Sequence, residues 1–183
     1  ATPTFQEMAR TWFETLARAI VGQQVSRAAA SAIWQKMEAR GVTGMDAVAG
    51  AGIEAMMAAG LSRRKAEYLI GIADEIASGR LDIDSLADMP GEDVQKRLVA
   101  IRGVGAWTAD NFRLFALADM DAWPVKDVAL QEAMRILKSL DARPTAEEME
   151  ILGEAWRPWR GAGALVLWHL YAVEVRKVTV ADI

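Results

Sequence analysis

Residues 98–110 read Leu-Val-Ala-Ile-Arg-Gly-Val-Gly-Ala-Trp-Thr-Ala-Asp, an apolar stretch that passes through a Gly-Val-Gly turn into a second helical pattern. This pattern predicts two helices, over 91–100 and 106–117, joined by a tight glycine hairpin. Gly103 and Gly105 permit positive φ and carry no Cβ, so backbone N–H groups there, and those of the helix that opens at Ala106, can approach an anion. A nucleic-acid phosphate fits such a cradle.

A carboxylate follows the hairpin at another helix start. The segment Trp123-Pro124-Val125-Lys126-Asp127 leads into an amphipathic run over 128–140, which places Asp127 at or beside a helix N-terminus. Both features also have a plain explanation, because Gly-x-Gly often only turns the chain and Asp often only caps a helix. A nucleotide-binding glycine loop is excluded, since that loop needs a preceding strand and a third glycine or a Lys-Ser/Thr pair.

The composition of the 183 residues indicates a globular chain. Hydrophobic residues make up 52%, enough to bury the core of one domain or of two closely packed lobes. Cysteine is absent, which excludes disulfides, thiolate metal sites and cysteine-ligated iron–sulfur clusters. No basic segment with a following apolar core opens the sequence and no run reaches the length of a membrane span, so we expect a cytoplasmic protein with no membrane partner.

The formal net charge of −4 argues against a uniformly basic DNA-binding surface, but it allows local contacts to a few phosphates. Arg63, Arg64 and Lys65 form the only run of three basic residues, at the expected start of a helix. Cations gain nothing from the dipole at a helix N-terminus. A nearby phosphate is therefore one explanation of this run, and simple solvation is the other.

Apolar periodicity and capping residues predict helices along the whole chain. Ser26 and Ser62 are expected N-caps, Thr145 with Glu148 forms a capping box, and Pro158 opens the last helix. No stretch predicts a strand, so the expected fold class is all-α. Besides the hairpin pair, the expected helices cover 5–21, 26–38, 45–49, 53–58, 62–78, 127–140, 145–155 and 158–173.

Five stretches taken together resemble one family, the helix-hairpin-helix DNA glycosylases, and within it the 3-methyladenine DNA glycosylase II branch. They occur in the family's order, as IVGQQVS (20–26), GLSRRKA (60–66), IRGVGAWTA (101–109), PVKD (124–127) and WRPWR (156–160). The resemblance covers nearly the whole chain and implies a single glycosylase domain over 1–183. That domain is an all-α, two-lobed helical bundle with a helix-hairpin-helix unit at about 91–117 and an active-site cleft between the lobes.

The resemblance also implies which residues contact DNA. The position of Gln24 supplies the wedge that enters the duplex and fills the gap left by a flipped nucleotide. Without the resemblance, the sequence favours the interpretation of Gln24 as a solvated loop residue. Gly103, Gly105 and Thr108 belong to the hairpin that holds a DNA phosphate.

The base pocket and the catalytic group follow from the same resemblance. It implies Asp127 as the catalytic carboxylate and Trp107 and Trp168 as aromatic walls. Lyase-active members have, at the position of Trp107, the lysine that attacks the sugar, so strand cleavage is expected to be missing. Asn111 and Val128 match further pocket positions, which can be aromatic in the family and here are not.

A single carboxylate suits one substrate class. A base alkylated at N3 or N7 is already cationic and leaves without protonation, so the enzyme has only to stabilise an oxocarbenium-like sugar and admit water. We therefore expect a monofunctional DNA N-glycosylase that flips and hydrolytically removes alkylated purines of the 3-methyladenine and 7-methylguanine type in base excision repair. Two alternatives stay open: a non-catalytic helix-hairpin-helix DNA-binding module, and an all-α protein whose glycines and Asp127 only turn and cap helices.

The remaining expectations concern partners. The partner is double-stranded DNA with alkylated bases, bound by a monomer at the nucleoid of a bacterium. The resemblance implies that backbone carbonyls of Val99, Ile101 and Val104 hold a structural K⁺ or Na⁺ that bridges to the phosphate. No other cofactor is expected.

Overall fold

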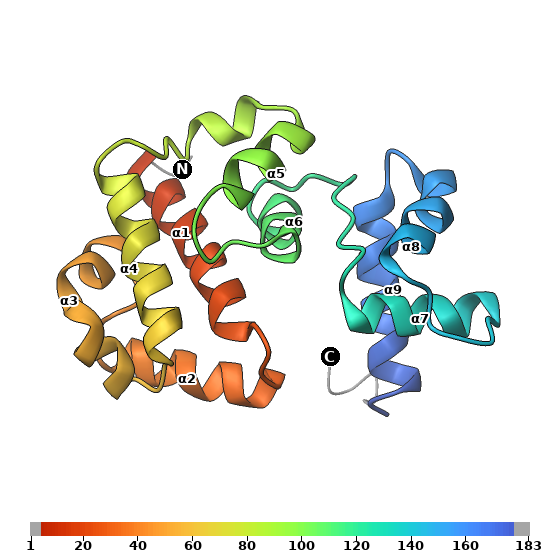
Figure 1. Cartoon of the computed structure of the whole chain (residues 1–183), viewed down its shortest axis with the longest axis horizontal. Coiled ribbons are helices and arrows are strands. Elements are labelled where there is room, and N and C mark those ends of the chain that lie inside the picture. The colour runs from red at the N-terminus through yellow and green to blue at the C-terminus, as the bar shows by residue number, and fades with distance from the viewer. Residues whose placement is uncertain (1–4, 178–183) are drawn as a thin grey trace. The chain divides into compact units, whose positions relative to one another are not determined.

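The computed structural model describes residues 5–177, and every regular element in that range is a helix. The chain divides into two compact units, Ala1–Leu117 and Ala118–Ile183 (Figure 1). The all-α prediction is confirmed. None of the helices in 5–177 combines the length and the apolar character that crossing a bilayer requires.

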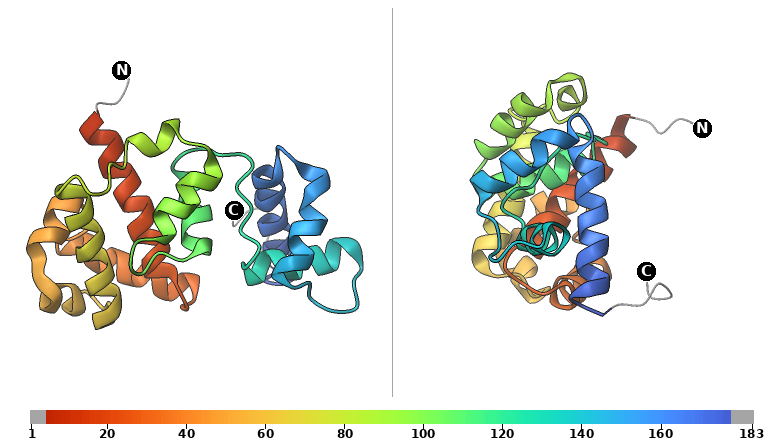
Figure 2. Two further views of the ribbon diagram at one scale, coloured as in Figure 1. Left: turned by 45° about the horizontal axis from the view of Figure 1, so that its top comes forward. Right: turned by 90° about the vertical axis from the view of Figure 1, so that its right-hand side faces the viewer.

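The first unit contains the hairpin. Its α3 packs on α4, and α6 packs on both α1 and α5, which lie beside it in the turned views (Figure 2). Gln95 Nε2 of α5 donates to Asp110 Oδ1 of α6 at 2.7 Å and so ties the two helices together, while Arg113 Nη1, also on α6, donates to the same oxygen at 3.0 Å. The elements are α1 (Phe5–Gly22), α2 (Arg27–Ala39), α3 (Met45–Ala58), α4 (Arg63–Ala77), η1 (Ser85–Asp88), α5 (Gly91–Val99) and α6 (Ala106–Phe115).

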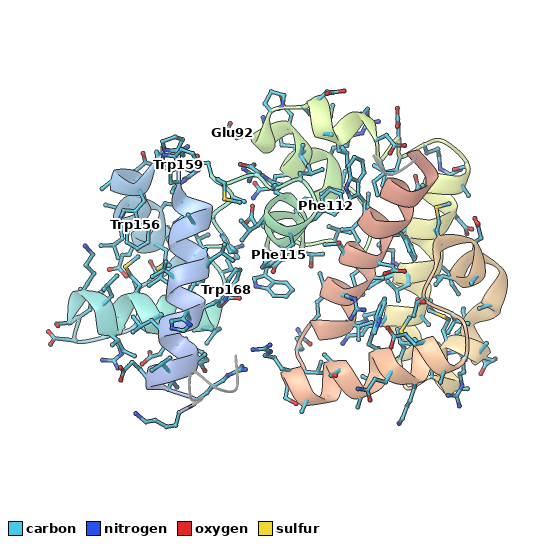
Figure 3. The ribbon with its side chains drawn as sticks, turned by 180° about the vertical axis from the view of Figure 1, so that it is seen from behind. Glu92, Phe112, Phe115, Trp156, Trp159 and Trp168 are labelled. Carbon is cyan, nitrogen blue, oxygen red and sulfur yellow. The ribbon has the colours of Figure 1, made fainter. Side chains whose placement is uncertain are left out.

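Capping residues begin two of these helices where the sequence predicts. Ser26 Oγ accepts from Ala29 N at the start of α2, and Ser62 Oγ accepts from Lys65 N at the start of α4. Gly52, with φ +72°, kinks α3 between the two fragments expected there. The core of the unit includes fully buried apolar side chains of α1, α4 and α6, among them Phe13, Leu16, Ile20, Leu69, Ile72 and Phe112. Figure 3 labels Phe112 on α6.

The second unit consists of α7 (Val128–Lys138), α8 (Ala146–Gly153), η2 (Glu154–Trp156) and α9 (Arg160–Glu174), with α7 packed on α9. The capping box of Thr145 and Glu148 is confirmed, with both reciprocal hydrogen bonds present.

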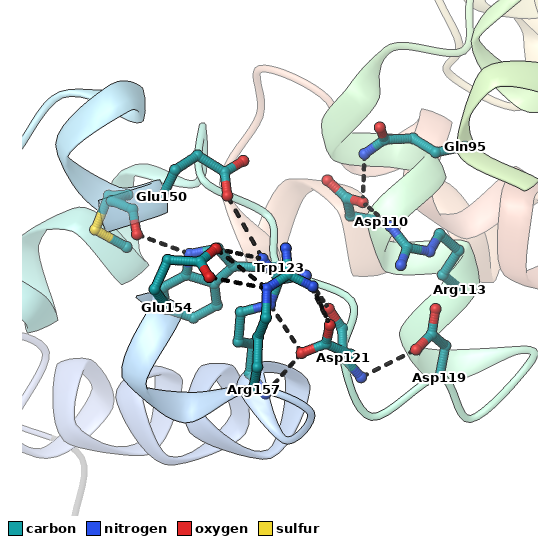
Figure 4. Close-up of polar contacts among 11 residues, drawn as sticks. Gln95, Asp110, Arg113, Asp119, Asp121, Trp123, Glu150, Glu154 and Arg157 are labelled. Atoms are coloured by element: carbon teal, nitrogen blue, oxygen red, sulfur yellow. Dashed lines mark hydrogen bonds and ion pairs between the residues drawn. The ribbon is translucent and has the colours of Figure 1, made fainter. Parts of the chain in front are cut away.

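The predicted start of the last helix at Pro158 is wrong, because α9 begins at Arg160. Residues 120 and 121 hold the first turn of α9: Gly161 N donates to Met120 O at 2.6 Å, and Arg160 N donates to Asp121 Oδ1 at 3.5 Å. The Arg160 side chain, 8% exposed, also makes two 2.8 Å hydrogen bonds to the Asp121 carboxylate. Arg157 reaches the same carboxylate at 2.8 Å (Figure 4). These long-range partners, which the local pattern does not reveal, determine where α9 begins.

Three of the seven tryptophans, Trp123, Trp156 and Trp168, pack in the core of this unit. Trp123 and Trp156 meet edge to face with ring centroids 5.6 Å apart, and Trp123 Nε1 donates to Met149 O at 2.9 Å. Cβ atoms on Gly153 and Gly163 would overlap these two rings. Both glycines are therefore needed for close packing.

Candidate nucleic-acid interface and catalytic carboxylate

The hairpin runs from the end of α5 at Val99 to the start of α6 at Ala106. Val104 N donates to Ile101 O at 3.0 Å and closes the turn. Gly103 adopts φ +94°, as the sequence predicts, and a Cβ atom there would overlap Tyr68 of α4. Gly103 is thus required both by its backbone conformation and by packing within the unit.

Gly105 has a different role. Gly105 does not use the positive φ that glycine permits, since it has φ −93° and ψ 172°, an extended conformation open to any residue. It is the N-cap of α6, has no side-chain cap, and a Cβ atom there would meet nothing within 4 Å. The first N–H groups of a helix lack intrahelical acceptors. The absent side chain therefore leaves space for an external acceptor at the start of α6.

Gln24 lies at the apex of the turn between α1 and α2. It is exposed and has φ +55°, a left-handed conformation that is unusual outside glycine. The turn therefore presents an exposed amide side chain from a strained backbone, a combination that occurs at functional sites.

The neighbouring Gln23 side chain points the other way, into the unit. Its Nε2 donates to Gly103 O at 3.1 Å and to Thr108 Oγ1 at 3.0 Å. Thr108 is 1% exposed. The Thr108 hydroxyl is therefore buried and accepts from the Gln23 amide, while the Thr108 backbone N–H belongs to the first turn of α6; DNA contact at Thr108 stays a prediction.

The basic run at the start of α4 does not act as one cluster. Lys65 Nζ donates to Val21 O at 2.7 Å and to Gln23 O at 2.8 Å, and burial lowers the pKa of Lys65. Arg63 pairs with Glu54 at 2.8 Å, and Arg64 is exposed. The Lys65 ammonium is thus engaged by two backbone carbonyls inside the unit, and a phosphate near the basic run stays a prediction.

In the second unit, Asp127 is the N-cap of α7. Its Oδ1 accepts from Leu130 N at 2.9 Å, and the residue is partly exposed. Gln131 Nε2 donates to Val125 O at 2.8 Å, which fixes the segment just before the cap. The plain prediction of a cap is thus confirmed. The same geometry holds a carboxylate at a helix N-terminus, where the dipole stabilises negative charge.

The expected pocket residues are placed within each unit as follows. In the first, Asn111 Nδ2 donates to the Trp107 carbonyl at 2.7 Å, so this amide is engaged by its own helix and is 8% exposed. In the second, Val128 follows Asp127 and is 55% exposed, while Trp168 lies on α9, partly buried against the core (Figure 3). Trp107 is also partly exposed.

The contacts that Gln23 and Lys65 make within the first unit are not predicted from the sequence. The adjacent glutamines 23 and 24 give no signal that separates an outward from an inward side chain. The two carbonyls that Lys65 Nζ contacts lie more than 40 positions earlier in the sequence. Only the packing of α1 against α4 reveals them.

The fold and the glycine hairpin define a helix-hairpin-helix protein. A family model described as "HhH-GPD superfamily base excision DNA repair protein" matches residues 17–158, and the chain belongs to that superfamily.

Curated relatives agree with this assignment. DNA-3-methyladenine glycosylase 1 of Schizosaccharomyces pombe is 30% identical over 161 residues, which cover 85% of this chain and 71% of that protein. Two Bacillus subtilis proteins, a putative and a named DNA-3-methyladenine glycosylase, are 37% and 36% identical over 59% and 58% of this chain. The matches span only 38% and 35% of those two relatives.

Solved structures show the same fold. A 3-methyladenine DNA glycosylase of S. pombe, in complex with abasic DNA, superposes with a TM-score of 0.82 and 28% identity over 92% of this chain and 83% of that one. A DNA-3-methyladenine glycosidase of Bacillus halodurans gives a TM-score of 0.74 and 33% identity, over 91% and 77% of the two chains.

Proposed function

We propose that this protein is a monofunctional DNA N-glycosylase that removes alkylated purines, of the 3-methyladenine and 7-methylguanine type, in base excision repair. The observation that carries the proposal is the Asp127 carboxylate, partly exposed and held at the N-terminus of α7 by Leu130 N. The names of the relatives support the substrate class. The substrate is double-stranded DNA, bound by a monomer, in a bacterium at the nucleoid.

Hydrolysis of this glycosidic bond requires little from the protein beyond a correctly positioned negative charge. A base methylated at N3 or N7 carries a positive charge, so its glycosidic bond breaks without a general acid. The sugar then develops oxocarbenium character, which a fixed carboxylate such as Asp127 stabilises until water adds to it. Because Leu130 N and the α7 dipole hold Asp127, little reorganisation is needed at the moment of reaction. We assign recognition of the cationic base to the aromatic faces of Trp107 and Trp168.

The residue at position 107 indicates whether the reaction leaves the DNA strand intact. A lyase forms a Schiff base between a lysine amine and the sugar and then breaks the strand. Trp107 offers no such amine, so we propose that the product is an intact strand with an abasic site.

Duplex binding is assigned to the first unit. The start of α6 beside Gly105 presents backbone N–H groups to a phosphate, and Gln24 enters the stack when a nucleotide leaves it. Backbone anchorage of this kind is independent of sequence. It therefore suits an enzyme that must search for damage anywhere in DNA.

An alkali cation at the hairpin is part of the proposal. Val99 ends α5, so its carbonyl belongs to the last turn, where helix carbonyls lack intrahelical partners. Ile101 O accepts one hydrogen bond, from Val104 N, and a carbonyl oxygen has two lone pairs. Carbonyl oxygens of Val99, Ile101 and Val104 therefore fit K⁺ or Na⁺, which would supply positive charge beside a bound phosphate.

The deciding experiment measures base release. Purified protein is incubated with duplex DNA treated with a methylating agent, and free bases are separated and quantified, with untreated duplex as the control. Release of methylated purines from the treated DNA alone is expected. Binding without release would indicate a non-catalytic DNA-binding module, and neither binding nor release would leave the hairpin and Asp127 as structural features only.

A further inference from the structure

The strained turn that carries Gln24 is bonded on two sides to the rest of the first unit. On one side, Gln23 Nε2 reaches Gly103 O in the hairpin and Thr108 Oγ1 in α6, at 3.1 and 3.0 Å. On the other, Lys65 Nζ from α4 reaches Val21 O and Gln23 O, at 2.7 and 2.8 Å. Four hydrogen bonds thus join this turn and the end of α1 to two segments that lie far away in the sequence.

These hydrogen bonds stabilise the backbone conformation of the turn. Gln24 is a non-glycine residue at positive φ, a strained conformation that persists only where its surroundings hold it. Gln23 is partly buried and its amide bonds two acceptors, while the Lys65 ammonium bonds one carbonyl of the last turn of α1, Val21 O, and one of the turn itself, Gln23 O. The conformation that exposes Gln24 is therefore imposed by Gln23 and Lys65 rather than by local preference.

We infer that Gln23, supported by Lys65, is a positioning residue that holds the Gln24 turn in fixed register with the hairpin, so that wedge and phosphate anchor act as one rigid element. This inference rests on the proposed function. The bond from Gln23 to Gly103 O joins the turn directly to the hairpin, next to the N-terminus of α6. DNA with a phosphate bound at the hairpin would therefore meet the Gln24 side chain at a fixed distance along the strand.

Rigid spacing matters because a wedge is useful only at the gap that it fills. Misplacement of a positioned group by about 1 Å costs on the order of a hundredfold in rate. Without Gln23, the phosphate would still bind, but Gln24 would sample other positions and the extruded nucleotide would return to the stack. Loss of Gln23 should therefore reproduce loss of Gln24 without loss of DNA binding.

The test compares duplex with single-stranded methylated DNA in single-turnover reactions. Gln23→Met removes both hydrogen bonds at similar length, and Gln35→Met, on the exposed surface of α2, is the matched control. Gln23→Met should slow excision from duplex by roughly tenfold or more, and excision from single strands by less than about twofold, because there is little stacking to overcome. Thr108→Val, which removes the hydroxyl acceptor of Gln23, should also slow excision from duplex more than from single strands. Thr108→Ser keeps this acceptor and should restore the rate on duplex.

A double variant separates positioning from an independent effect. Gln23→Met combined with Gln24→Ala should be no slower on duplex than Gln24→Ala alone, since a displaced wedge and a missing wedge are equivalent. If the rate losses of the two single variants multiplied in the double variant, the inference would be overturned. Equal losses on duplex and single strands would also overturn it, because they would indicate general destabilisation.

A second readout does not depend on catalysis. Duplex DNA with 2-aminopurine beside the lesion becomes fluorescent when the stack opens, and Gln23→Met should suppress this rise at saturating protein. If the wild-type protein releases no base, the glycosylase proposal fails; loss of the fluorescence rise in Gln23→Met would still support the positioning role. An unchanged rise would overturn that role whatever the activity.

Discussion

Gly103 lies directly against the Tyr68 side chain, so closely that a Cβ atom on Gly103 would overlap the ring. Gly105, two residues on, has open space where its side chain would be. The two glycines of one motif therefore differ, because Gly103 is required by its packing against Tyr68, whereas no part of the protein lies within 4 Å of a Cβ atom at position 105. This difference makes them a matched pair for experiment.

Gly105→Val is expected to weaken binding to all DNA sequences alike. Its extended backbone accepts valine, but the side chain would occupy the space through which a phosphate reaches the α6 N–H groups. A lost hydrogen bond to a charged group corresponds to roughly tenfold or more in affinity. Titrations at fixed salt, with the melting temperature unchanged, check this. The control is Gly103→Ala, which should lower the melting temperature because it forces strain and overlap with Tyr68. Unaltered affinity in Gly105→Val would refute the phosphate role.

Asp127→Asn is expected to retain the fold while losing activity. Asparagine is as good an N-cap as aspartate, so Leu130 N keeps an acceptor. The negative charge is lost, however, and removal of one preorganised electrostatic group reduces the rate by on the order of a hundredfold or more. Single-turnover release of free base, together with DNA affinity, measures both effects. Release at the wild-type rate would remove Asp127 from the mechanism.

The strand should stay intact after the wild-type reaction. The indole of Trp107 cannot form the Schiff base that precedes strand cleavage. Methylated duplex incubated with the protein should therefore break only after alkali, which cleaves abasic sites, when the products are run on a gel. Breaks without alkali, together with covalent trapping of protein on DNA by borohydride, would contradict this reading of position 107.

Binding should depend on the monovalent cation. If carbonyls of Val99, Ile101 and Val104 hold K⁺ or Na⁺ next to a phosphate, replacing the salt by a tetraalkylammonium salt at equal ionic strength should weaken DNA binding. Equal ionic strength keeps general screening constant. Affinity that is indifferent to the exchange would count against the ion.

Acid should destabilise the second unit partly through Asp121. Burial alone would raise the pKa of this carboxyl, but the hydrogen bond and charge of Arg160, with the charge of Arg157, outweigh it and hold the pKa below its ordinary 3.8. A carboxyl with a lowered pKa in the folded state stabilises the protein above its unfolded pKa, and that stabilisation is lost as pH falls through the folded pKa.

Asp121→Asn should therefore lower the free energy of unfolding at pH 7 by about 2 kcal/mol. The difference from wild type should shrink between about pH 5 and pH 2. Denaturant unfolding across this range checks both statements, and Asp141→Asn at an exposed site is the matched control. A constant difference at every pH would show that Asp121 acts only by packing.

The sequence alone was sufficient for the helices, their caps and the identity of the hairpin. Apolar periodicity and caps such as Ser26, Ser62 and Thr145 involve residues within three or four positions of each other, so a linear pattern contains them. The placement of Asp127 at a helix start follows from the same local rule.

The tertiary structure alone decided which of two similar residues faces outward. Gly103 differs from Gly105 because Tyr68 of α4 lies against one and not the other. Gln23 differs from Gln24 because the Thr108 hydroxyl, 85 positions away, accepts a hydrogen bond from the Gln23 side-chain amide. Arg160 starts α9 because Asp121, 39 positions earlier, holds its guanidinium. Such partners meet only when helices pack, and side chains with the same local surroundings then acquire different roles.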